Sequence, residues 1–149
     1  MTPNPAYVAA LKESVRSADY PTLIGMTLGD IAFDSCRIDL ELGQRHLQPF
    51  GIVHGGVLAT LIDTATFWAG YLRLPQGTGL VNVDLKLNYL KPANAGALRA
   101  QGRCLRAGRQ LSYAEAHVYD AAGDLVAHGT STLMALPGKD LAIDVAKFL

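Results

Sequence analysis

The chain has 149 residues, of which 50% are hydrophobic and 17% are charged, a composition that excludes a disordered chain and predicts one compact domain. Thirteen Lys and Arg balance thirteen Asp and Glu, so the formal net charge is zero, and nucleic acid and anionic membrane surfaces are not expected as partners. No apolar run approaches the roughly 18 residues of a membrane-spanning helix, and the N-terminus lacks the pattern of a secretion signal, so we expect a cytoplasmic protein.

The first predicted element is a short amphipathic helix. Asn4 is a suitable N-cap, Pro5 suits the first helical position, and the apolar residues up to Val15 recur at helical spacing. We assign this helix to an N-terminal helical extension that covers residues 1–25. The apolar residues from Cys36 to Leu42 then alternate with polar ones, which predicts a strand that ends at Gly43.

Residues 46–56 contain a proline and several glycines and predict an irregular segment that leads into a helix. The helix should run from Gly55 to Tyr71, and its almost continuous apolar sequence is typical of a helix that is enclosed on all sides. Asp63 is the only charged residue inside it.

The rest of the chain alternates with a period of two. We predict one strand from Leu80 to Tyr89, then strands over about 96–105, 110–119 and 124–136, joined by short turns that imply antiparallel neighbours. The predicted fold class is therefore α+β, with a curved antiparallel sheet wrapped around one long central helix. The C-terminal tail, 137–149, fits a short helix or an irregular segment equally well.

The two cysteines, Cys36 and Cys104, lie far apart in alternating segments, which favours buried free thiols over a disulfide. Neither lies near a cluster of other residues with metal-ligand spacing, so we expect no metal site. His117 and His128 are interpreted as ordinary strand residues.

Chemistry is expected at the start of the central helix. A helix N-terminus presents unpaired N–H groups and a partial positive charge, and Gly55 and Gly56 leave that end unobstructed. The Gly55 N–H could polarise a carbonyl oxygen and stabilise negative charge that develops on it. The alternative is that both glycines only permit close packing.

Asp63 is the second candidate. It lies eight residues after Gly55, which is about 12 Å along a helix axis, so one chain cannot bring both groups to one carbonyl. Two antiparallel copies of the helix could do so, which would place the active sites at a two-fold dimer interface. A carboxylate among apolar residues needs a partner or it would be protonated, and the structural alternative is an Asp hydrogen-bonded to Thr60, to Thr64 or across a subunit contact.

Two stretches carry a family resemblance, HLQPFGIVHGGVLATLIDTA from His46 to Ala65 and LVNVDLKLNYLKPA from Leu80 to Ala93. They resemble the hot-dog fold acyl-CoA thioesterases, particularly the group of the phenylacetate-pathway thioesterase. The resemblance implies a single hot-dog domain over residues 1–149. It also implies that Gln48 hydrogen-bonds near the thioester or orients the water, that the Gly55 amide polarises the thioester carbonyl, and that Asp63 of the neighbouring subunit is the general base or nucleophile.

The resemblance extends to the substrate-binding residues. Asn82 aligns with a Ser or Thr that some members place near the nucleophilic water, and an Asn can hold a water without supplying a hydroxyl. His54 should support the loop and the helix start. We expect substrate contacts from His54, Gly56, Asn82 and Phe67. Aromatic rings at Phe50, Phe67, Trp68 and Tyr71 would line an acyl pocket.

The implied reaction is hydrolysis of a small aryl or short to medium-chain acyl-CoA to the free acid and coenzyme A, without a cofactor. The implied assembly is a homodimer that pairs into a homotetramer. One alternative is a hot-dog hydratase or dehydratase with His46 in the active site, although the acid expected about fourteen residues later is replaced by Thr60. Another is an acyl-CoA binding module without turnover.

Overall fold

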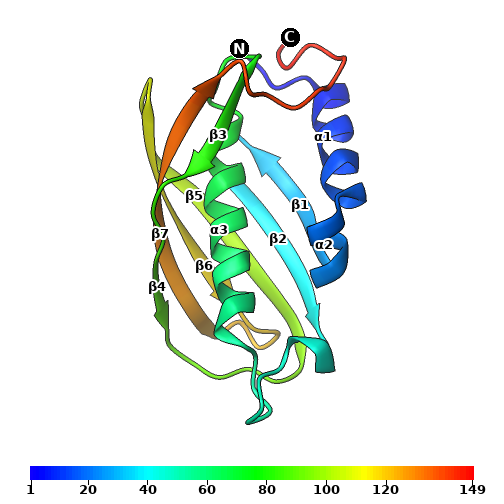
Figure 1. The fold of residues 1–149 in the computed structure, drawn as a ribbon, viewed down its shortest axis with the longest axis vertical. Helices are drawn as coiled ribbons and strands as arrows, with labels where there is room; N and C mark the ends of the chain where they lie inside the picture. The colour runs from blue at the N-terminus through cyan, green and yellow to red at the C-terminus, as the bar shows by residue number, and fades with distance from the viewer.

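A seven-stranded antiparallel sheet curls around one long helix, α3 (Gly55–Tyr71), as Figure 1 shows. The computed structural model describes residues 1–149. The strands are β1 (Met26–Ala32), β2 (Ser35–Leu42), β3 (Thr78–Asn82), β4 (Lys86–Tyr89), β5 (Gly96–Ala107), β6 (Leu111–Tyr119) and β7 (Leu125–Pro137). Their order in the sheet is β1-β2-β5-β6-β7-β3, and β4 also pairs with β7. The predicted α+β class and the curved sheet around a central helix are confirmed.

The helix lies directly against the inner face of the sheet. At Gly102 of β5, an added Cβ would come within 2.1 Å of the Ala65 carbonyl oxygen, so only glycine allows the backbones to approach this closely. The side chains of Leu61, Ile62 and Ala65 are fully buried there. The prediction that α3 is enclosed on all sides is wrong for a single chain. A stripe along the helix from Gly56 to Phe67 stays partly exposed.

The N-terminal extension packs beside α3 (Figure 1). It contains α1 (Pro5–Ser17), where Asn4 accepts a hydrogen bond from the Ala6 N–H as the predicted N-cap, and α2 (Asp19–Ile24). The following strand, β1, was not predicted. It carries Gly29, and its register shifts between Leu28 and Ile31, which obscures the alternating pattern.

The predicted strand from Leu80 to Tyr89 is in fact two strands, β3 and β4. Between them, the Asp84 carboxylate accepts the Thr132 N–H at 2.6 Å, and the Ser131 hydroxyl donates to the Asp84 carbonyl at 2.8 Å. These side-chain bonds stand beside one remaining backbone bond, from the Val83 N–H to the Thr132 carbonyl at 2.9 Å. The polar and apolar residues keep alternating through the break, so the sequence pattern could not reveal it.

The tail after β7 contains no helix and returns to the N-terminus, where Phe148 bridges to Pro3. Both cysteines are buried and unpaired, as predicted, and burial raises the pKa of the Cys36 thiol to about 12. None of the helices combines the length and the hydropathy required to cross a bilayer.

Candidate active site

The N-terminus of α3 has one free backbone donor. His54 is the N-cap, and its Nδ1 accepts the Gly56 N–H at 2.7 Å. An added Cβ at Gly56 would lie 2.9 Å from this nitrogen, so a glycine is needed beside the histidine cap. No hydrogen bond in the chain uses the Gly55 N–H. The histidine therefore satisfies one amide and leaves the neighbouring amide available to a ligand.

Gln48 reaches the same place from the preceding loop. A bridge between Leu47 and Val53 closes this loop, and the Gln48 side-chain oxygen accepts the Phe50 N–H. The Nε2 group of Gln48 makes no hydrogen bond within the chain. Gln48 and Gly55 line one cavity of about 540 Å³, together with Ile52, Val53, Leu58, Tyr89, Leu90, Lys91 and Pro92. The structure therefore brings two predicted donors to one cavity.

Tyr89 is a residue of this cavity that the sequence analysis missed. An added Cβ at Gly55 would lie 3.1 Å from Cζ and 3.2 Å from the hydroxyl of Tyr89, so the ring covers the glycine. Its side chain is 58% exposed, which leaves the hydroxyl accessible. Only its place at the end of an alternating strand was visible in the sequence, and that pattern carries no sign of a site.

Asp63 lies in a second, mostly apolar cavity of about 260 Å³ between α3 and the N-terminal helices. The other lining residues are Ser14, Val15, Ala18, Pro21, Met26, Thr64, Phe67, Trp68 and Leu141. No side chain or amide donates to the Asp63 carboxylate, so the alternative of a structural Asp bonded to Thr60 or Thr64 is not observed. Burial without a compensating donor raises the pKa of the Asp63 carboxyl above its ordinary value.

The aromatic residues predicted for an acyl pocket divide into three groups. Phe67 and Trp68 line the Asp63 cavity, with their rings edge to face at 4.7 Å. Tyr71 is instead buried at the far end of α3, and Phe50 is 91% exposed at the tip of the loop. The prediction was therefore wrong for Tyr71, and Phe50 contacts neither cavity.

Asn82 lies on β3 beside α3 and lines neither cavity. Its amide donates to the Ser131 hydroxyl at 2.8 Å and lies 3.3 Å from the Thr66 hydroxyl and 3.4 Å from the Asp63 carbonyl. These contacts tie the strand to the helix turn that carries Asp63. Within one chain, Asn82 therefore helps to position the helix backbone at Asp63 and does not contact its carboxylate.

Residues 50–127, just over half of the chain, match the family model of the thioesterase superfamily. The chain belongs to the thioesterase superfamily. The matched region includes Gly55, Asp63 and Asn82, whereas Gln48 lies just before it.

Individual proteins of known sequence or structure are also similar to this chain. The proofreading thioesterase EntH of Klebsiella pneumoniae is 35% identical over 85 residues, which cover 57% of this chain and 62% of EntH. The chain thus spans less than two thirds of this relative. The crystal structure of thioesterase HI1161 from Haemophilus influenzae has a TM-score of 0.81, with 24% identity and coverage of 89% of this chain and 92% of that chain. The Escherichia coli PaaI protein from the phenylacetic acid degradation operon has a TM-score of 0.80 at 19% identity, with coverage of 89% and 95%. At these identities the two structures show the hot-dog fold alone.

His46, the residue required by the hydratase alternative, is not available to a substrate in this member of the superfamily. Its side chain is buried, its Nδ1 accepts the Gly43 N–H at 2.9 Å, and its Nε2 lies 2.6 Å from the Ile24 carbonyl. Because both ring nitrogens are bonded to backbone groups, His46 joins β2, α2 and the loop before α3. This observation disfavours acid or base chemistry at His46.

Proposed function

We propose that this thioesterase-superfamily member hydrolyses acyl-CoA thioesters as a homodimer, with each active site built from two chains. One observation carries the proposal: the Gly55 N–H, the Gln48 Nε2 group and the Asp63 carboxylate lie in two separate cavities along α3 and make no hydrogen bond within the chain. Gly55 and Gln48 line one cavity, and Asp63 lines the other. Two copies of α3 packed antiparallel would place Asp63 of each chain beside Gly55 of the other.

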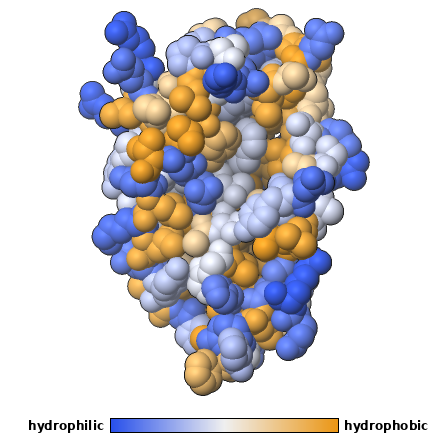
Figure 2. Space-filling model, viewed as in Figure 1, coloured by the Kyte–Doolittle hydropathy of each residue, from blue (hydrophilic) through white to orange (hydrophobic).

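The surface around α3 suits a second copy of the chain. The stripe from Gly56 to Phe67 is partly exposed, and hydrophobic residues gather beside it on the face shown in Figure 2. Strands β3 and β4 form one edge of the sheet, since each pairs only with β7. Exposed apolar side chains on and next to this edge include Val81, Val83, Tyr89 and Leu90. Pairing of such dimers into a homotetramer and a cytoplasmic location are further parts of the proposal.

In the proposed reaction, the thioester carbonyl oxygen accepts the free Gly55 N–H, and the Gln48 amide donates to the same oxygen or to the water. Asp63 of the second chain then removes a proton from water as the water attacks, or attacks directly to give a mixed anhydride that water hydrolyses. In both routes the C–S bond breaks, and coenzyme A leaves with the electron pair and takes up a proton. The products are the free acid and coenzyme A, and no cofactor takes part.

The Asp63 cavity suits the acyl group. Its volume of about 260 Å³ and its lining by Phe67, Trp68 and Val15 favour a small aryl or a short to medium-chain acyl group over a long chain. The raised pKa of Asp63 suits a general base, since a more basic carboxylate accepts a proton more readily. The Asp63 carboxyl must still be ionised to act. On the acid side, kcat/KM should therefore fall off at a pH above the ordinary pKa of an aspartate.

The test is release of free thiol from acetyl, hexanoyl, lauroyl, benzoyl and phenylacetyl coenzyme A. Asp63→Asn should reduce kcat by about 100-fold or more, which corresponds to about 2.7 kcal/mol of transition-state stabilisation. Asp144→Asn, a change to an exposed aspartate in the tail, is the matched control and should retain full activity. Binding of these compounds without thiol release by the unmodified chain would contradict the proposal and favour the binding module.

A further inference from the structure

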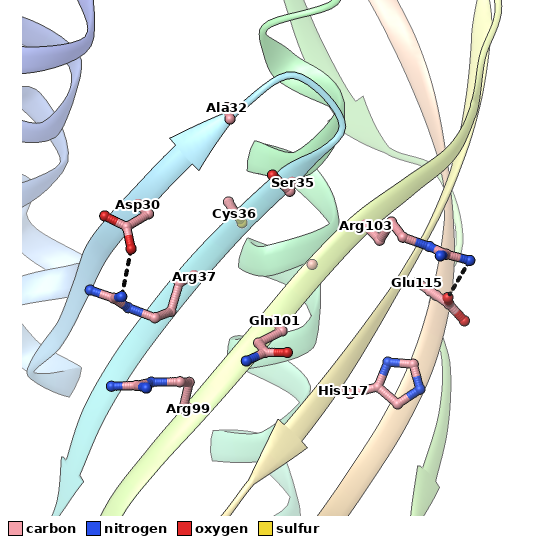
Figure 3. A pocket seen from close by; sticks show the side chains of 11 residues that line it. Asp30, Ala32, Ser35, Cys36, Arg37, Arg99, Gln101, Arg103, Glu115 and His117 are labelled. Atoms are coloured by element: carbon pink, nitrogen blue, oxygen red, sulfur yellow. Dashed lines mark hydrogen bonds and ion pairs between the residues drawn. The ribbon is translucent and has the colours of Figure 1, made fainter.

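The outer face of the sheet, on the side away from α3, carries a cluster of metal-ligand residues that the proposed reaction does not use. Figure 3 shows this face with α3 behind the strands, and Glu115 and His117 project from β6 at one end of a polar hollow of about 560 Å³. His128 on β7 is the direct register partner of His117. The donor atoms of these three residues all lie within 4.8 Å of one another.

We propose that Glu115, His117 and His128 bind one divalent transition-metal ion of the zinc class, with water in the remaining position. Two imidazoles and one carboxylate form a donor set that such ions prefer over magnesium or calcium, which favour oxygen ligands. The site is independent of the thioesterase proposal, because it lies on the opposite face of the sheet from the α3 cavities.

The spacing of the donors fits a tetrahedral ion. Atoms bound to zinc at roughly 2.0–2.1 Å stand about 3.3 Å apart. His128 Nε2 and Glu115 Oε2 are 3.2 Å apart, which already matches this separation. The rings of His117 and His128 have centroids 4.6 Å apart and a tilt of 51°. The donor atom of His117 also lies within 4.8 Å of the other two, so it belongs to the same three-residue set.

The surroundings hold the ligands in place. Arg103 on β5 contacts the other oxygen of Glu115 at 3.5 Å, and this contact orients the carboxylate while its second oxygen faces His128. The Tyr119 ring stacks on His117 with centroids 6.2 Å apart. All three ligands are partly buried on the outer face of two paired strands, so an ion there would fix β6 to β7 and remain accessible to solvent.

The experiment is a calorimetric titration of the metal-free full chain with Zn²⁺ at about pH 7.5, repeated with Co²⁺, whose absorption spectrum reports coordination. The proposal predicts about one ion per chain and a four-coordinate Co²⁺ spectrum. His117→Ala and His128→Ala should each weaken binding by about 10- to 100-fold or more.

The matched control is Asn88→Ala. Asn88 lies opposite His128 on β4 and is exposed, and its loss should leave metal affinity unchanged. Equal thermal midpoints of all variants without metal would show that they are folded. The proposal is overturned if the unmodified chain shows no saturable binding, or if the two histidine variants bind as tightly as the unmodified chain.

Discussion

The two ends of α3 both carry buried or half-buried polar groups, but only one end satisfies them. At the C-terminal end, the Tyr71 hydroxyl donates to Asp140 and lies 2.7 Å from the Tyr7 hydroxyl. Lys147 donates to the Tyr71 carbonyl at 3.1 Å, and its ammonium lies 3.9 Å from the centre of the Tyr71 ring. Every polar group named here has a partner from a distant segment, so this end joins the two termini to the helix.

The N-terminal end and the middle of the helix show the opposite pattern. The Gly55 N–H, the Gln48 amide nitrogen and the Asp63 carboxylate have no partner in the chain. All three groups are only partly buried, so they remain open to solvent, to a substrate or to a second chain. Polar groups that are satisfied within the chain thus serve the fold, whereas unsatisfied ones mark the place where a substrate and a second chain are expected.

The largest effect in this comparison should follow from a change at the unsatisfied end. Gln48→Ala should lower kcat by about 100-fold, since it removes a donor to the reacting group, and should cost no more than about 1 kcal/mol of stability from the lost bond to the Phe50 N–H. Thiol-release kinetics and urea denaturation measure the two quantities. Gln44→Ala, at an exposed position four residues earlier, is the control. A stability loss large enough to account for the lost activity would show that Gln48 serves the fold.

A change at the satisfied end should have the reverse effect. Tyr71→Phe removes the hydroxyl between Tyr7 and Asp140 and leaves both without that partner, which should cost about 1–3 kcal/mol of stability. The kcat of the folded variant should stay unchanged. Tyr113→Phe, at a residue 43% exposed, should be nearly neutral in the same denaturation experiment. A drop in kcat for Tyr71→Phe without a loss of stability would contradict the view that the C-terminal end of α3 serves the fold and not catalysis.

A third effect concerns the pH dependence of stability. Burial lowers the pKa of Lys147 from 10.5 to about 8, and attraction to Asp140 offsets part of this shift. Between about pH 8 and 10 the unfolded chain holds a proton that the folded chain has lost, so stability should rise with pH in this window. Above pH 10 the folded chain keeps a proton on Tyr71 that the unfolded chain loses, because the pKa of Tyr71 is raised in the folded chain. Stability should therefore fall with pH in that range. Lys147→Met should abolish the rise, and an unchanged slope in this variant would contradict the assignment.

Much of the fold could be predicted from local patterns. The boundaries of α3 and of the strand from Cys36 to Leu42 followed from helical and alternating periodicity, and Asn4 followed from cap chemistry. The break at Asp84 could not be predicted, because it depends on bonds to Ser131 and Thr132, almost fifty residues away.

The candidate site, like the fold, could be predicted from the sequence only in part. The motif and the rise of a helix were sufficient to predict that Gly55 and Asp63 do not meet within one chain, and the two cavities agree with this. The sequence did not reveal Tyr89 over Gly55, or that His117 and His128 face each other. Both contacts arise from strand register and from the curvature of the sheet around α3, which periodicity does not encode.

The central claim, that each active site takes groups from two chains, can be tested by mixing two inactive variants. Asp63→Asn and Gln48→Ala are co-expressed with different tags, and the mixed dimer is purified. If the sites are shared, one site collects both changes and the other collects neither, so the mixed dimer should regain about half of the unmodified activity. If each chain works alone, every site keeps one change, and the mixed dimer will be as inactive as its parents, which would contradict the account.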